Sequence, residues 1–195
     1  MVGPEHRSVS DFRSCEGDSN MYSAPTWDPE QYLRHAGHRT RPFLDMLARI
    51  STLPSASRPA RIADLGCGPG NVTALLADRW PDAHITGFDL SPQMLAQAEK
   101  EYAGTTVGGG WLDFRPADAA HWTPEEPYDL IVSNAALQWV PNHPESFAVW
   151  IDGLVPGGTL AFQVPGNFTS PSHALLGELC ETPRWRARLG DHGRR

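Results

Sequence analysis

An acidic residue, a glycine-rich turn and a second acidic residue form the chemically suggestive part of this chain. Asp64 ends one apolar run and is followed by Gly66, Gly68 and Gly70, and Asp89 ends the next apolar run. Glycines let backbone N–H groups approach a ligand closely, and an acid after the second run is placed to accept both hydroxyls of a ribose. The pattern predicts a βαβ unit with a nucleotide-type ligand at the carboxyl ends of its strands.

The glycine spacing separates two classes of nucleotide cofactor. A dinucleotide fingerprint reads G-x-G-x-x-G and would need glycine where this chain has Asn71. A carboxylate beside the turn, at Asp64, disfavours a pyrophosphate and favours a ligand with an ammonium or sulfonium group. We therefore predict S-adenosyl-L-methionine rather than NAD, the alternative being that Asp64 and Asp89 only cap helices.

Other positions follow strands at the same predicted edge. Asp118 and Ala119 come after the third strand, near where an adenine ring would rest, and Asn134 ends the fourth strand. The alternatives are an exposed loop acid for Asp118 and an ordinary turn residue for Asn134. The predicted cofactor-binding residues are Asp64, Gly66, Gly68, Gly70, Asp89, Leu90, Asp118, Ala119 and Asn134.

Predicted strands alternate with predicted helices five times, which indicates an α/β fold with a doubly wound parallel sheet. We expect strands at about 62–64, 84–89, 111–115, 128–133 and 159–164. We expect a first helix from near Pro42, a loop at 104–110, and a helix at 145–155 that turns Phe147, Ile151 and Leu154 inward. One more helix is expected at 172–181.

Composition limits the remaining possibilities. The chain has 195 residues, enough for one α/β domain with a core, and a polar N-terminus. We expect residues 1–24 to be a disordered extension, residues 25–58 a helical cap and residues 59–195 the cofactor-binding domain. A net charge of -7 argues against nucleic acid as a partner, and three scattered cysteines suggest no metal cluster. No apolar run approaches the ~20 residues of a spanning helix, so we expect no membrane partner and a cytoplasmic location.

The motif residues resemble those of class I S-adenosylmethionine-dependent methyltransferases, which have a Rossmann-like sheet. More narrowly, the chain resembles the trans-aconitate 2-methyltransferase family over about residues 26–185. The narrower resemblance rests on these stretches: Trp27-Asp28-Pro29 with Tyr32, and the segments 39–42, 134–139, 163–168 and 171–173.

The resemblance implies methyl transfer to a carboxylate of trans-aconitate, a small polycarboxylic acid. A carboxylate is already an anion at neutral pH, so no general base is needed and we predict no catalytic residue. Arg39 and Arg41 are candidates for holding the acid, because guanidinium groups match carboxylates. His38, Gln138 and Trp139 are secondary candidates. The alternative for the arginines is a solvated helix N-terminus.

The end of the chain departs from the family pattern. Class I methyltransferases usually add an antiparallel pair after strand five, in the order 3-2-1-4-5-7-6. The residues after Val164 contain no two strand-like runs. We therefore expect a truncated C-terminus without strands six and seven, and an apolar edge at strand five. Two alternatives stay open: a methyltransferase for another small molecule, and a cofactor-binding fragment without activity.

Overall fold

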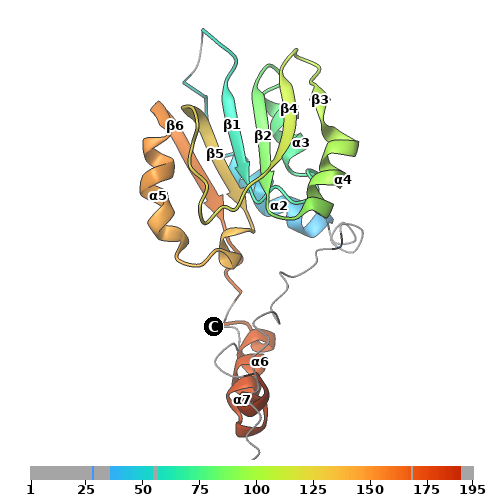
Figure 1. Cartoon of the computed structure of the whole chain (residues 1–195), viewed down its shortest axis with the longest axis vertical. Helices are drawn as coiled ribbons and strands as arrows, with labels where there is room; N and C mark the ends of the chain where they lie inside the picture. The colour runs from blue at the N-terminus through green and yellow to red at the C-terminus, as the bar shows by residue number, and fades with distance from the viewer. Residues whose placement is uncertain (1–27, 29–35, 55–56, 168, 190–195) are drawn as a thin grey trace, which may run out of the picture.

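A six-stranded sheet forms the centre of the computed structural model, which describes residues 28, 36–54, 57–167 and 169–189 (Figure 1). The strand order is β3-β4-β2-β1-β5-β6. The strands are β1 (Arg61–Leu65), β2 (His84–Asp89), β3 (Gly104–Thr105), β4 (Trp111–Pro116), β5 (Tyr128–Asn134) and β6 (Leu154–Gln163). All five longer strands run parallel, as predicted.

The short strand β3 was not predicted, because the glycine-rich run 104–110 indicates a loop. Gly104 and Thr105 pair antiparallel with Leu112 and Trp111 of β4. The Thr106 N–H donates to the Gly110 carbonyl oxygen at 3.1 Å, which closes a tight hairpin between the two strands. The glycines therefore make a turn that adds a sixth strand at the β4 edge.

Helices cover both faces of the sheet. They are α2 (Ala36–Leu47), α3 (Thr73–Arg79), α4 (Pro92–Tyr102) and α5 (His143–Asp152), with a 3-10 turn η1 (Leu137–Trp139). Ile62 packs in one core cluster with residues of α2, α3 and α4, whereas Ala63 packs in another with Trp150 of α5. Neighbouring residues of a strand point to opposite faces, so α5 lies on the face opposite the other three helices.

The first helix begins earlier than predicted. Pro42 lies inside α2 and not in its first turn, so Arg39 and Arg41 are helical residues and do not precede the helix. The fixed φ of proline suits a helix, but inside a helix proline removes one backbone hydrogen bond and crowds the carbonyl four residues earlier. The residues of the predicted apolar stripe are all buried: Phe43 and Leu47 lie in α2, and Ile50 follows its end.

The prediction for the helix at 145–155 was wrong in its end and for one residue of its buried face. Phe147 and Leu154 pack against the core as predicted, but Ile151 does not. The helix α5 ends at Asp152, and Leu154 and Val155 already belong to β6. Trp150 is fully buried, while Ile151 is 55% exposed. Trp150 stacks edge-on with Trp122 at 6.4 Å between ring centroids and donates its indole N–H to the Trp122 carbonyl. This partner from a distant loop sets which side of α5 faces inward.

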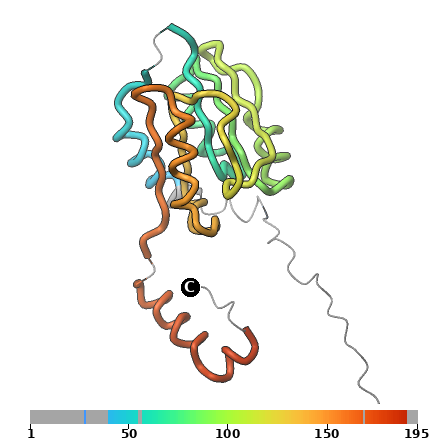
Figure 2. Tube along the Cα trace, turned by 60° about the vertical axis from the view of Figure 1, so that its left-hand side comes forward, coloured from blue at the N-terminus to red at the C-terminus, as the bar shows by residue number. Residues whose placement is uncertain are grey.

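Beyond β6 the described residues form two helices, α6 (Pro171–Glu181) and α7 (Pro183–Leu189). Both lie away from the sheet, as the red segment of Figure 2 shows. In the described part of the chain β6 therefore remains an edge of the sheet, as predicted, and its Phe162 is 41% exposed. The proposed N-terminal extension 1–24 lies outside the described residues.

Candidate cofactor-binding site

The glycine turn after β1 is tied to the end of β2 by backbone hydrogen bonds. The N–H groups of Gly66 and Cys67 both donate to the carbonyl oxygen of Phe88, at 2.7 and 3.0 Å. The N–H of Gly68 donates to Oδ2 of Asp89 at 2.9 Å. These bonds bring the two motifs predicted from the sequence together at the carboxyl edge of the sheet.

Each of the three predicted glycines has a positive φ, but their surroundings differ. A Cβ on Gly70 would lie 2.9 Å from the Cβ of Ala98 and from the ring of Phe114, so Gly70 serves close helix packing. A Cβ on Gly68 would meet no atom within 4 Å. Gly68 thus leaves open space beside the turn, where a ligand can approach the backbone.

The Asp89 carboxylate anchors two backbone segments. Besides the Gly68 N–H, it accepts the N–H of Ser91 through Oδ1 at 2.8 Å. Ser91 in turn caps α4, since its hydroxyl accepts the N–H of Met94 at 3.4 Å. Each carboxylate oxygen can accept more than one hydrogen bond, so Asp89 retains capacity for ribose hydroxyls.

Asp64 lies beneath the turn and does not line the cavity described below. The residue is 1% exposed, and its Oδ2 accepts a hydrogen bond from the hydroxyl of Thr73, the first residue of α3, at 2.7 Å. The other oxygen, Oδ1, is buried without a hydrogen-bond partner among the described residues. Burial raises the pKa of Asp64 to about 7, and the nearby charge of Asp89 adds to this, while the Thr73 hydroxyl opposes it.

Asp118 sits in the loop after β4 and faces the cavity. Its Oδ1 accepts the Ala120 N–H at 2.9 Å, and its Oδ2 lies 3.0 Å from Nδ1 of His121. The hydrogen bond from Ala120 and the contact with His121 lower the pKa of this carboxyl below its usual value. Asp118 is therefore ionised at neutral pH and held in a fixed orientation.

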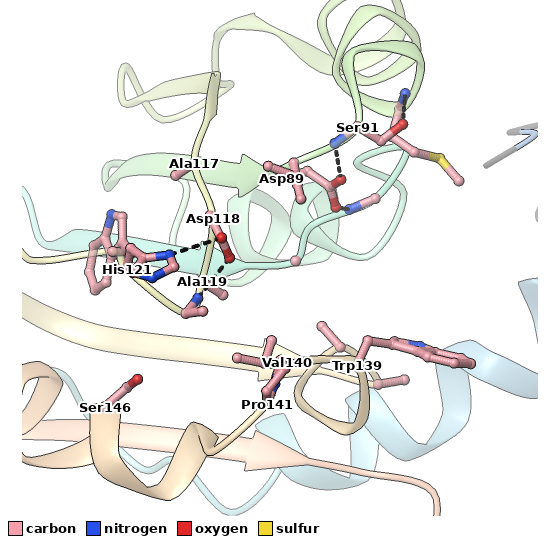
Figure 3. Close-up of a pocket in the computed structure, with 18 of the residues that line it drawn as sticks. Asp89, Ser91, Ala117, Asp118, Ala119, His121, Trp139, Val140, Pro141 and Ser146 are labelled. Carbon is pink, nitrogen blue, oxygen red and sulfur yellow. Dashed lines mark hydrogen bonds and ion pairs between the residues drawn. The ribbon is translucent and has the colours of Figure 1, made fainter. Parts of the chain in front are cut away.

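A cavity of about 1030 Å³ opens between these two acids and the segment after β5. Figure 3 shows Asp89, Asp118 and His121 on one side, with Trp139, Pro141 and Ser146 opposite. Its size suits a nucleotide-sized ligand together with a small second molecule. Of the predicted cofactor residues, the cavity is lined by Gly66, Gly68, Asp89, Leu90, Asp118, Ala119 and Asn134.

Of the predicted substrate residues whose side chains are described, one lines the cavity and two do not. Trp139 lines the cavity and is 51% exposed. Gln138 does not line it: its Nε2 donates to the Ala135 carbonyl oxygen at 2.6 Å. Arg41 also does not line it; its side chain is 86% exposed and pairs with Asp45 at 3.8 Å. The side chains of His38 and Arg39 lie outside the description.

Several lining residues were not predicted. His121 comes from the loop after β4, while Asn142, Glu145 and Ser146 come from the start of α5. The sequence did offer a signal for the second group. The first turn of α5 is polar, whereas the buried Trp150 lies on the opposite side of this helix. Among the described lining residues there are three carboxylates, Asp89, Asp118 and Glu145, and no Lys or Arg.

A comparison with known proteins shows which family this part of the chain matches. Residues 62–158 match the family described as "Methyltransferase domain". This segment contains the glycine turn, Asp89, Asp118 and Asn134. Residues 62–158 therefore have the sequence of a methyltransferase domain.

The chain is also similar to proteins named trans-aconitate 2-methyltransferase. It is 69% identical over 167 residues to such a protein from Streptomyces coelicolor, covering 86% of this chain and 54% of the relative. It is 66% identical over 169 residues to one from Streptomyces avermitilis, covering 87% of this chain and 62% of the relative. The chain thus spans a little over half of the length of these relatives.

The fold has solved counterparts. The structure of "SAM bound CalS10, an amino pentose methyltransferase from Micromonospora echinaspora", matches with a TM-score of 0.53 and 22% identity. The match covers 74% of this chain and 59% of the other. At this identity the comparison supports the fold alone. Within the described residues no helix is long and apolar enough to cross a membrane.

Proposed function

We propose that this chain binds S-adenosylmethionine in the 1030 Å³ cavity and transfers its methyl group to a carboxylate of a small polycarboxylic acid, trans-aconitate. The observation that carries the proposal is the Asp89 carboxylate, which holds the glycine turn at Gly68 and borders the cavity. Identities of 66–69% to trans-aconitate 2-methyltransferases support the choice of acceptor.

The residues present fit the cofactor. Open space beside Gly68 admits a ligand, Asp89 can accept ribose hydroxyls, and the fixed carboxylate of Asp118 can accept an adenine amine. The cofactor supplies an electrophilic methyl group. The protein's part is to align an acceptor oxygen with it and to exclude water, as the aromatic wall at Trp139 would do.

An acceptor carboxylate is ionised at neutral pH and can attack without a general base. The cations that would hold a polycarboxylate are proposed to be Arg39 and Arg41 of α2, with His38 beside them. Arg41 and its partner Asp45 are both exposed. An exposed ion pair contributes little to stability, so Arg41 can leave Asp45 and pair with a ligand carboxylate at a small cost in free energy.

One observation favours a second candidate function. The described cavity wall carries three carboxylates without Lys or Arg, which suits a neutral or cationic acceptor better than a tricarboxylate. Methyl transfer to a less charged small molecule is therefore the alternative, and binding of the cofactor without transfer is another outcome for this shorter chain.

The test uses the purified chain with labelled S-adenosylmethionine. Calorimetric binding of S-adenosylhomocysteine together with labelled methyl ester formed from trans-aconitate would support the proposal. Binding without transfer to trans-aconitate, but with transfer to a neutral alcohol or an amine, would select the second candidate. Absence of S-adenosylhomocysteine binding would contradict both.

A further inference from the structure

Two side-chain amides meet where β5 and β6 end. Asn134 and Gln163 are the last partners of the β5–β6 pairing. The Nε2 group of Gln163 donates to Oδ1 of Asn134 at 3.1 Å, and the Ala135 N–H donates to the Gln163 backbone oxygen at 2.9 Å. Asn134 is 6% exposed and lines the cavity, whereas Gln163 does not line it.

In this contact the oxygen end of the Asn134 amide faces Gln163. A primary amide has an oxygen that accepts and a nitrogen that donates, and the oxygen is engaged by Gln163. No hydrogen bond among the described residues uses Nδ2 of Asn134. The backbone here is part of the sheet, since Asn134 pairs with Gln163 and the preceding Ser133 hydroxyl donates to the Leu65 carbonyl oxygen at 2.7 Å.

We propose that Gln163 is a positioning residue that holds the Asn134 amide with its N–H groups toward the cavity, where they bind a carboxylate. The other amide orientation would place an oxygen there and repel such a group. Since the described lining has no Lys or Arg, neutral donors of this kind are what it offers to an anion. The carboxylate belongs either to the amino-acid end of the cofactor or to the acceptor, so the inference rests on the proposed function.

The test exchanges the donor for an acceptor of the same size. In Gln163→Glu the carboxylate can only accept, so Asn134 must turn its nitrogen toward position 163 and its oxygen toward the cavity. We expect affinity for S-adenosylhomocysteine or, in its presence, for trans-aconitate to fall at least tenfold by calorimetry. Gln163→Met removes the hydrogen bond without reversing the amide, and a loss of threefold or less is expected. Thermal unfolding verifies that each variant is folded.

A double-variant cycle separates positioning from the added negative charge. In an Asn134→Ala background, Gln163→Glu should have no further effect on either affinity. A tenfold loss that persists in this background would overturn the proposal, because the charge would then act directly. Unchanged affinity for both ligands in Gln163→Glu would overturn it as well.

Methylthioadenosine, which lacks the amino-acid end of the cofactor, identifies the source of the carboxylate. Weaker binding of S-adenosylhomocysteine with unchanged binding of methylthioadenosine assigns the carboxylate to the cofactor. Unchanged binding of both nucleosides with weaker binding of trans-aconitate assigns it to the acceptor. Equal weakening of both nucleosides contradicts the inference. If the unaltered chain bound no S-adenosylhomocysteine, the proposed function itself would fail first, which distinguishes the two failures.

Discussion

A Cβ atom added to Gly66 would lie 2.3 Å from the Cβ of Ala136. The turn after β1 and the turn after β5 therefore touch at a point where there is no room for one more carbon. Gly66 also has a φ of +77°, which L-residues rarely adopt. Gly66 and Ala136 both line the cavity, so this contact forms part of the cavity wall. It lies after β1 and β5, which are neighbouring strands of the sheet.

The first prediction follows from this contact. Gly66→Ala combines left-handed strain with overpacking, and we expect a loss of about 2–5 kcal/mol in the free energy of unfolding. Gly68→Ala is the matched control, because its φ is +57° but its Cβ meets nothing within 4 Å. It should lose only about 1–2 kcal/mol. Urea unfolding of both variants checks this, and equal losses would contradict the importance of the Ala136 contact.

The second prediction concerns Asp89. Asp89→Ala removes the acceptor for the N–H groups of Gly68 and Ser91 together with the proposed acceptor for the ribose. Hydrogen bonds to a charged group contribute about 1.5–3 kcal/mol, so affinity for S-adenosylhomocysteine should fall at least tenfold. Asp82→Ala makes the same charge change at an exposed position before β2. It should leave the affinity unchanged, and similar losses in both variants would speak against a specific role.

The elements with a strong periodic pattern could be predicted from the sequence, whereas contacts between distant segments could not. The spacing of Phe43 and Leu47 was sufficient to identify the buried face of α2. For α5, Ile151 and Trp150 both fit helical spacing from Phe147. The choice depended on Trp122, which reaches Trp150 only in the folded chain.

In the candidate site, too, some features could be predicted from the sequence and others could not. Strand ends and glycines indicated the edge of the sheet where Asp89, Asp118 and Asn134 gather. The sequence could not show that Asp64 points beneath the turn to Thr73 and away from the cavity. Nor could it show that Gln138 folds back onto Ala135, because the direction of a side chain in an irregular turn depends on backbone angles that spacing does not reveal.

The third prediction concerns pH. The pKa of Asp64 is raised to about 7 in the folded protein, so between about pH 4 and 7 the folded state holds a proton that the unfolded state has lost. Stability from this group is therefore complete below about pH 4 and falls as pH rises toward 7. Asp64→Asn, which does not titrate, should lack this decline. We expect the stability of Asp64→Asn relative to the unaltered chain to increase from pH 4.5 to pH 8 in urea unfolding; a constant difference would contradict the raised pKa.

The last prediction uses two tryptophans of similar exposure. Trp139 is 51% exposed and lines the main cavity, whereas Trp111 is 49% exposed on β4 and lines a separate pocket of about 210 Å³. A ligand in the main cavity should contact the Trp139 ring and change its fluorescence. Titration with S-adenosylhomocysteine and then trans-aconitate should give a signal that Trp139→Phe loses and Trp111→Phe keeps. Because Trp139 lies across the cavity from Asp118 and His121, we expect most of this change in the second titration (Figure 3). A signal that disappears with Trp111→Phe instead would place the ligand outside this cavity.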